Sequence, residues 1–230
     1  LRLSSSTLSG TCDTLGRFRN LLIKNGLQEK LFAQVVAALM ARGLILKKGT
    51  IVDSTIISAP SSTKNKEKKR DPDAHRVKKG NTWHFGYKAH IGVDRDSGLV
   101  HTVEATAANV HDATETSKLL TGDEDEVYGD SGYLGAEKRG DAIIRNKAGR
   151  KIKYRINRRP SQVKKLSKSG QYAAKKAEHA KSSVRAKVEH AFGVVKKQLR
   201  FRKTRYRGLE KQRAKFNIMF ALANLILADR

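Results

Sequence analysis

Hydrophobic positions recur with a helical spacing in three parts of the chain. Over residues 14–43 and 209–227 they form one-sided stripes, and Gly43 supplies a stop after the first stripe. Residues 171–199 are rich in Ala, Lys and Glu, which favours a long helix by propensity. The expected core positions are Leu31, Phe32, Val35, Val36, Leu39, Met40, Leu209, Phe216, Phe220, Ala223 and Leu227.

Other segments have the composition or the alternation of strands. Residues 50–58 are β-branched and apolar, which predicts a buried strand. Residues 82–94 alternate, so we expect a half-buried strand that forms a hairpin with residues 99–105. Residues 126–130 predict a further short strand. The order of elements predicts an α/β domain with a mixed sheet. The apolar face of the alternating strand would carry Trp83, Phe85, Tyr87, Ala89, Ile91 and Val93, and the polar face His84, Lys88, His90 and Asp94.

The remaining segments predict loops and short helices. Residues 60–80 read as a polar, basic loop and residues 136–146 as a helix. Asp94 fits a turn, and Asp112 with Glu115 fits a capping box that opens a helix to Leu120. The acidic run at 123–126 predicts a solvated loop, and residues 150–170 form a strongly basic segment without acids.

Aromatic and histidine side chains have competing interpretations. Trp83 could stack on a nucleobase, but its place on the apolar face favours core packing. His84 and His90 share a strand face without a Cys or a closely spaced partner, so the sequence does not predict a zinc site.

The charge balance points to a polyanionic partner. The chain has 230 residues with 48 Lys+Arg against 22 Asp+Glu, a net charge of +26. Nucleic acid is the expected partner for such a charge, with DNA favoured and a basic RNA-binding protein of the ribosomal kind as an alternative. The single cysteine, Cys12, excludes an internal disulfide and fits a reducing cytoplasm. The longest apolar run, 218–228, is too short to span a bilayer, and the first residues do not form a signal peptide.

Three acids stand out by their context. Asp53 lies inside the predicted buried strand, where a lone carboxylate is costly, and Asp130 ends another strand. Glu189 lies on the long helix, with Arg185 four residues before it and Lys196 seven residues after it. Converging carboxylates in a basic protein suggest a site for Mg²⁺ or Mn²⁺. The simpler alternative for Glu189 is an ordinary ion pair with Arg185.

Several motifs resemble one family of enzymes. They are GTIVDSTIISAPSSTKNK, GNTWHFGYKAHIGVD, VEATAANVHD, VYGDSGYLG, VRAKVEHAFGVVKK and RYRGLEK, in this order over roughly residues 14–228. These segments resemble the DDE transposases of the insertion-sequence-five group. The resemblance implies a ribonuclease-H-like fold, with a mixed sheet flanked by helices, and a reaction that cuts DNA at the ends of an insertion element and transfers the strands to target DNA.

The resemblance also implies roles for individual residues. Asp53, Asp130 and Glu189 would be catalytic and would bind Mg²⁺ or Mn²⁺. Arg185 and Lys196 would hold the DNA backbone or the carboxylates, and we also expect Lys88 and Lys197 to contact DNA. Ser182 stands where the family signature has tyrosine.

The partners implied are the terminal inverted repeats and target DNA, bound by a homodimer in the cytoplasm at the nucleoid, without a membrane. We expect an N-terminal helical segment over 1–48, the remnant of a longer region, and a catalytic domain over 49–230 with a basic loop at 60–81. A truncated, inactive DNA-binding remnant is the alternative.

Overall fold

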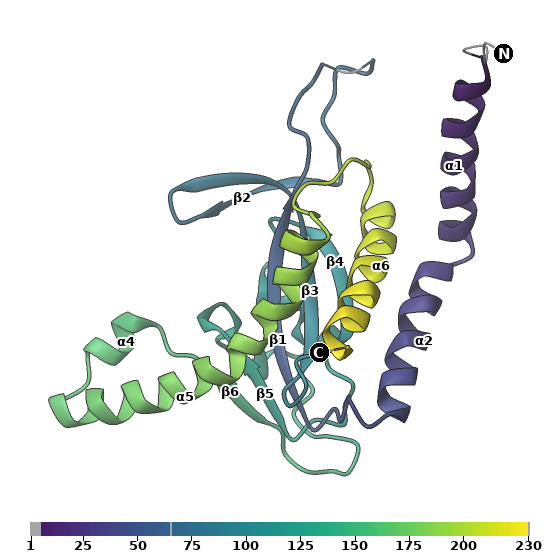
Figure 1. Ribbon diagram of the computed structural model, residues 1–230. Helices are drawn as coiled ribbons and strands as arrows, with labels where there is room; N and C mark the ends of the chain where they lie inside the picture. Colours follow the sequence, from purple (N-terminus) through teal and green to yellow (C-terminus); the bar gives the residue numbers. More distant parts are fainter. Residues whose placement is uncertain (1–5, 65, 230) are drawn as a thin grey trace.

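The computed structural model describes residues 6–64 and 66–229, with side chains described from residue 14 onward. Residues 1–5, for which we predicted no signal peptide, and the Cys12 side chain lie outside this description. The main helices are α1 (Ser6–Lys24), α2 (Leu27–Ala41), α3 (Thr116–Leu119), α4 (Pro160–Lys164), α5 (Lys168–Gly193) and α6 (Leu209–Ala228). The strands are β1 (Gly49–Ser58), β2 (His75–Lys79), β3 (Thr82–Asp94), β4 (Val100–Ala107), β5 (Glu126–Gly129) and β6 (Lys153–Ile156) (Figure 1).

The strands form one mixed sheet. Its order is β2-β3-β1-β5-β6, and β4 also pairs with β3. The β1–β3 and β3–β4 pairs are antiparallel, whereas β1–β5 and β5–β6 are parallel. The predicted mixed sheet flanked by helices is therefore confirmed, including the hairpin of β3 and β4.

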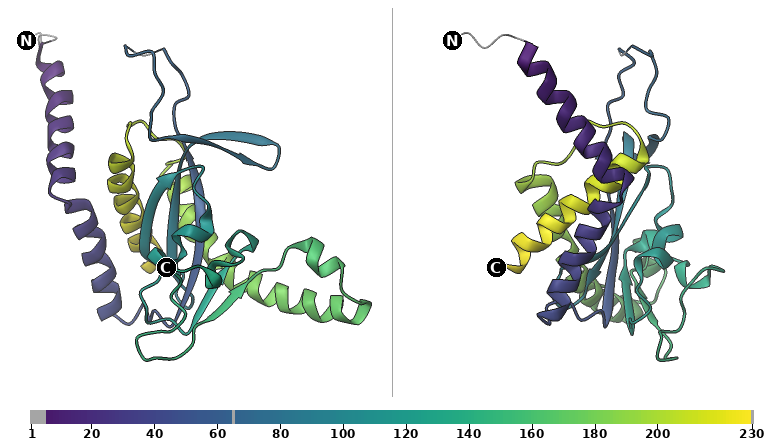
Figure 2. Two further views of the ribbon diagram at one scale, coloured as in Figure 1. Left: turned by 180° about the vertical axis from the view of Figure 1, so that it is seen from behind. Right: turned by 90° about the vertical axis from the view of Figure 1, so that its right-hand side faces the viewer.

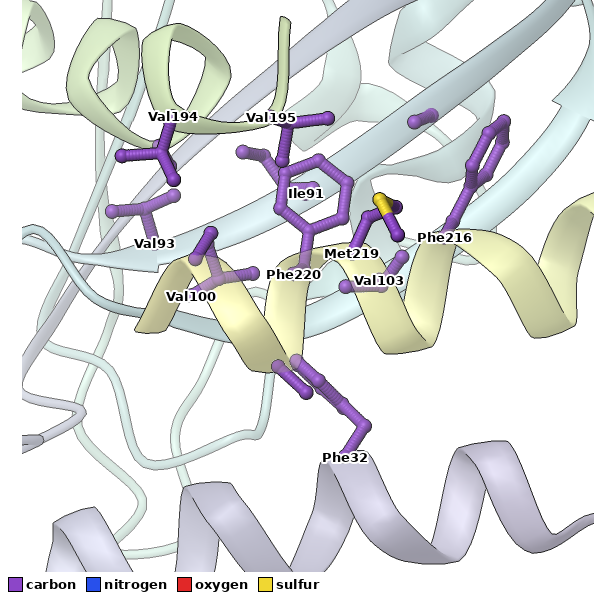
Figure 3. Close-up of a cluster of buried hydrophobic side chains, with 14 of the residues drawn as sticks. Phe32, Ile91, Val93, Val100, Val103, Val194, Val195, Phe216, Met219 and Phe220 are labelled. Carbon is purple, nitrogen blue, oxygen red and sulfur yellow. The ribbon is translucent and has the colours of Figure 1, made fainter. Parts of the chain in front are cut away.

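The larger hydrophobic core lies between the sheet and the helices α2, α5 and α6. Helix α6 lies between α2 and the sheet (Figures 1 and 3). Phe32 of α2 points toward α6, and Phe220 of α6 points toward Ile91 of β3 and Val195 (Figure 3). These buried aliphatic and aromatic side chains fix α5 and α6 on one face of the sheet.

A smaller core covers the opposite face. Val52 and Val127 pack there with Leu119 of α3, Tyr133 and Ile156. Since side chains alternate along a strand, Ile51 belongs to the larger core and Val52 to the smaller one. The centre of the sheet is thus covered on both sides.

The N-terminal stripe forms two helices. Asn25 and Gly26 interrupt the single helical region expected over 14–43, because Gly26 adopts the left-handed conformation with φ of 60°. Helix α2 contributes Phe32, Val36 and Leu39 to the larger core, whereas α1 extends away from the sheet (Figures 1 and 2). A domain boundary at residue 48 stays a prediction.

The prediction of a half-buried strand over residues 82–94 is wrong: the start of the strand is exposed, and the rest is buried on both faces. From Gly86 to Asp94 both faces of β3 are buried, including the supposedly polar positions Lys88, His90 and Asp94. Trp83, which we placed in the core, is 65% exposed. The alternation predicted a strand with one solvent-exposed face, but in the fold both faces of this strand are covered by packed side chains.

Three other local predictions fail. The basic loop at 60–80 contains the strand β2, which forms a hairpin with the start of β3. Residues 136–146 contain only a short 3-10 turn at Ala136–Lys138 rather than a helix. Within the acidic run, Glu124 is fully buried and accepts hydrogen bonds from Thr50, Thr121 and Gly122, so it is a structural residue rather than part of a solvated loop.

Candidate active site

Three polar residues lie level with one another just beyond the segments over which β1, β5 and β6 pair in parallel. Strand pairing sets Ile51 opposite Tyr128, and Gly129 opposite Ile156. Continuing this register places Asp53 beside Asp130, and Asp130 beside Asn157. Neighbouring strands lie about 4.8 Å apart, and residues in register project on the same side. The fold therefore brings the two predicted aspartates together and places next to them Asn157, which no sequence pattern marks as a site residue.

The guanidinium of Arg185 connects the two outer members of this row. It reaches Asp53 Oδ2 from Nη2 at 3.4 Å and Asn157 Oδ1 from Nη1 at 3.3 Å. The Asp53 carboxylate shares its face of the sheet with Ile51, the face covered by α5. Of the two roles left open for Arg185, this geometry shows the contact with a carboxylate.

The serine that replaces the signature tyrosine supports the same cluster. Asn157 Nδ2 donates to Ser182 Oγ at 3.3 Å and to Glu178 Oε2 at 2.8 Å. These contacts orient the amide, so that its oxygen faces Arg185. Ser182 thus stabilises the guanidinium through Asn157.

The Asp53 carboxyl has an unusual affinity for protons. Burial raises its pKa from 3.8 to about 6, and the negative charge of Asp130 adds to this rise. The Ser54 amide, which donates to Asp53 Oδ1 at 2.7 Å, and Arg185 lower the pKa but do not cancel the effect of burial. The carboxylate therefore lacks compensating charge, and a cation between Asp53 and Asp130 would supply it.

Asp112 is a third acid beside Asp130 that the sequence reading assigned to a helix cap. The cap is instead His111, whose side chain accepts from the Ala113 amide. Asp112 Oδ1 accepts from Ser54 Oγ at 2.8 Å and from Lys88 Nζ at 3.0 Å. Asp112 comes close to the acids of the strands only through tertiary packing, so its spacing in the sequence does not predict this position.

Gly132 separates the carboxylates of Asp130 and Asp112. A Cβ atom at this glycine would lie 2.9 Å from Asp130 Oδ1 and 3.8 Å from Asp112 Oδ2. The amide of Gly132 also donates to Asp130 Oδ1 at 2.8 Å, which fixes that carboxylate. A side chain would fill the space between the two acids, so glycine leaves the space between their carboxylates open.

The hydroxyl of Tyr133 is buried beneath these acids. Tyr133 is 1% exposed, and its hydroxyl has no hydrogen-bond partner among the described residues. Burial, followed by the charges of Asp53, Asp112 and Asp130, holds the pKa of Tyr133 well above its usual value. The phenol therefore stays neutral, as a donor directed to an acidic environment.

Glu189 lies apart from the paired aspartates. It is exposed on α5, four residues after Arg185, which corresponds to about 6 Å along the helix axis. Among the described residues, no three His, Cys, Asp or Glu side chains are grouped closely enough to hold a metal ion. The site of three carboxylates thus stays a prediction. Two of its members, Asp53 and Asp130, lie close together in the structure.

A wider helical turn after Glu189 changes which lysine lies beside it. Residues Val194–Gln198 form a π-helical turn, with the Leu199 amide donating to the Val194 carbonyl. Such a turn contains one more residue than an α-helical turn. Lys197 lines a cavity with Glu189, and Lys196 does not; both lysines line a second cavity with Lys79 and Arg202. The straight alignment of Arg185, Glu189 and Lys196 expected from the sequence therefore does not continue through this turn.

The predicted DNA contacts differ in accessibility. Lys197 is exposed and Lys196 partly buried. Burial, with the nearby Lys79 and Arg202, lowers the pKa of Lys196. Lys88 is 8% exposed, and its ammonium donates to the Val110 carbonyl at 2.7 Å and to Asp112. A DNA contact of Lys88 stays a prediction.

The sheet order, with one acid inside β1 and a second directly after the adjacent parallel strand β5, defines a ribonuclease-H-like α/β protein. Residues 45–225 match the family model described as the transposase DDE domain, and the chain belongs to this family. It is therefore a transposase domain of the polynucleotidyl-transferase type, a class that acts on DNA and generally uses divalent metal ions. No solved structure matches the chain. Within the described residues, none of the helices has the length and apolar character needed to cross a membrane.

Proposed function

We propose that this protein is a transposase of the insertion-sequence-five group, which cuts DNA at the terminal inverted repeats of its element and joins the ends to target DNA. The observation that supports the proposal is the closeness of Asp53 and Asp130: each lies two residues beyond the paired Ile51 and Tyr128 of the parallel strands β1 and β5, and the charge of Asp130 raises the pKa of Asp53. Two carboxylates in this arrangement, one of them with a raised pKa, create a local negative charge in a chain of net charge +26.

The donor set fits a divalent cation. Asp53 and Asp130 supply oxygen ligands, which Mg²⁺ and Mn²⁺ prefer, and both cations also accept water and phosphate oxygens. When bound, such ions activate a water or hydroxyl and stabilise the leaving oxygen of a phosphodiester. We propose Asp53 and Asp130 as ligands, with Glu189 as the third acid. Glu189 is supplied by the helix that already carries Arg185 to Asp53.

The other residues of the site would hold its parts in place. Arg185 fixes the orientation of the Asp53 carboxylate through its link to Asn157. Lys196 and Lys197, with Lys79 and Arg202, line a basic hollow beside β1 that would take the phosphates of a DNA strand. A homodimer on two DNA ends would place one such site at each end.

Nicking of supercoiled plasmid in Mn²⁺ or Mg²⁺ tests the enzymatic proposal. Asp53→Asn and Asp130→Asn should each lower nicking at least about 1000-fold, because each removes a charged ligand contributing several kcal/mol. Asp141→Asn is the matched control. Asp141 is an exposed carboxylate paired with Arg139, and its replacement should leave nicking unchanged.

The main alternative is a DNA-binding protein without catalysis. Equal nicking by the parent protein and by Asp53→Asn would contradict the enzymatic proposal and leave this alternative. Strand transfer is tested separately, with a labelled duplex that carries the inverted repeat and a plasmid target. Stronger binding to structured RNA than to duplex DNA would favour an RNA-binding protein instead.

A further inference from the structure

The single tryptophan of the chain is exposed at the end of a strand hairpin. Trp83 is 65% exposed, although most of β3 is buried. The β1–β3 pairing ends at Ser58 and Gly86, so residues 82–85 extend past the end of β1 and pair with β2, with one further bond from the Ala59 amide to the Phe85 carbonyl (Figure 1). A large aromatic ring left in water contributes little to folding, and the side chains around it decide whether it belongs to an interaction site.

Basic side chains surround this ring. Lys78 lies opposite Trp83, and Arg76 lies opposite Phe85 in the β2–β3 register. Residues directly opposite on antiparallel strands project on the same face, so two basic residues alternate with two aromatic rings there. The guanidinium of Arg70 also lies 5.9 Å from the centre of the Phe85 ring.

A hollow lies beside the ring. It has a volume of about 710 Å³ and is lined by Ser58, Arg76, Trp83, His84, Phe85 and Lys203 among others. It adjoins the basic hollow of Lys79, Lys196 and Arg202, since both are lined by Ser58 and His84. A continuous basic surface thus leads from Trp83 toward the proposed DNA contacts.

The aromatic ring and the proposed metal ligand Asp53 lie on the same side of the sheet. Asp53 pairs with Ile91, which is eight positions from Trp83 and therefore on the same face of β3. The separation along the strand is at most about 26 Å. A DNA strand in B form advances about 3.4 Å per nucleotide, so about eight nucleotides cover this distance. One strand of a cleaved end could thus reach both places.

We propose that Trp83 binds an unpaired nucleobase of the DNA substrate by stacking, while Arg76 and Lys203 bind the adjoining phosphates. Aromatic side chains next to basic ones are the means by which proteins bind single-stranded DNA without sequence preference. A base inside a duplex does not expose its face to a ring, so the site selects unpaired nucleotides near the cut end. This inference rests on the proposed action on DNA.

Tryptophan fluorescence tests the proposal directly, because Trp83 is the only tryptophan. The probes are a blunt duplex, the same duplex with a few unpaired nucleotides at one end, and the unpaired strand alone. We expect quenching by the two probes with unpaired bases and little quenching by the blunt duplex. Trp83→Ala should weaken binding of the unpaired probes roughly ten- to hundredfold, whereas Trp83→Phe, which keeps a ring, should retain most of the affinity.

Tyr172→Ala is the matched control. Tyr172 is 75% exposed on α5 and lies outside the lining of this hollow, so its loss should not change binding of unpaired DNA. Circular dichroism of each variant checks that the fold is intact. Unchanged fluorescence when an unpaired probe is bound, or equal affinity of Trp83→Ala and the parent protein, would overturn the stacking proposal.

The Asp53→Asn variant separates this inference from the enzymatic proposal. It should lose nicking but keep the quenching of Trp83. Quenching in a protein that never nicks DNA supports the stacking site and contradicts only the catalytic role. Nicking without any response of Trp83 contradicts only the stacking site, and absence of binding to every DNA probe overturns both.

Discussion

Two aspartates near the same end of the β1–β3 strand pair show how one residue type serves two purposes. Asp53 of β1 and Asp94 of β3 both lie in a sheet covered on both faces. Asp94 is fully buried and accepts hydrogen bonds from the amides of Leu46, Lys47, Asp96 and Ser97. These bonds hold its pKa below the usual value despite burial.

Asp53 has the opposite balance. It accepts one backbone amide, from Ser54, and its ion pair with Arg185 is long at 3.4 Å. Burial raises its pKa to about 6. A carboxylate that the backbone satisfies is structural, whereas a carboxylate that the fold leaves under-compensated is available to a ligand. The contrast in hydrogen bonding to the backbone separates the structural acid from the candidate catalytic one.

The largest effect is expected when the structural acid loses its charge. Asp94→Asn replaces one acceptor oxygen by an amide that faces donor N–H groups, so several charge-assisted bonds are lost. We expect the free energy of unfolding to fall by about 3–5 kcal/mol. Thermal unfolding should show a decrease in Tm of roughly 10 °C. A change below 1 kcal/mol would remove the distinction between the two aspartates.

For Asp53→Asn we expect a smaller change in the free energy of unfolding, and of opposite sign. The pKa of Asp53 is raised in the folded state from 3.8 to about 6, so the ionised carboxylate destabilises the protein above pH 6. The shift of about two units is worth about 1.4 kcal/mol per unit. In metal-free buffer at pH 8 the variant should be more stable by about 1–3 kcal/mol, and below pH 4 this gain should vanish because both states are protonated.

Metal addition sharpens this measurement. A cation that binds the folded state alone stabilises it by mass action. Mn²⁺ should therefore raise the Tm of the parent protein at pH 8 and leave that of Asp53→Asn almost unchanged. Equal Mn²⁺ responses of the two proteins would show that the cation binds elsewhere.

Asp112 combines a structural ion pair with a place beside the candidate site. We expect its replacement to have the smallest effect on the free energy of unfolding. Asp112→Asn leaves the buried ammonium of Lys88 without its carboxylate, so we expect a loss of about 1–2 kcal/mol in unfolding free energy. Nicking should fall roughly tenfold to a hundredfold, as for residues that position a ligand. The double variant Lys88→Met/Asp112→Asn should lose less stability than the sum of the single variants, and additive losses would contradict the pairing.

The candidate site was only partly predictable. Asp53 and Asp130 could be selected because acids are rare inside apolar strands. Asn157, Asp112 and Tyr133 could not, because their relation to those acids depends on strand register and on the packing of the 3-10 turns after β4 and β5. The strand β6 was hidden in a basic segment whose composition carried no strand signal.

Local patterns alone determined the strands β1, β3, β4 and β5, the long helices α5 and α6, and the acids inside or beside the strands. Periodicity depends on neighbours a few residues apart, which the sequence contains. Only the tertiary structure decided that β3 is covered on both faces, that Trp83 extends beyond β1, and that Arg185 connects Asp53 to Asn157. Those relations depend on which segments meet across the sheet, and the free energy of packing and pairing sets them over long separations in the chain.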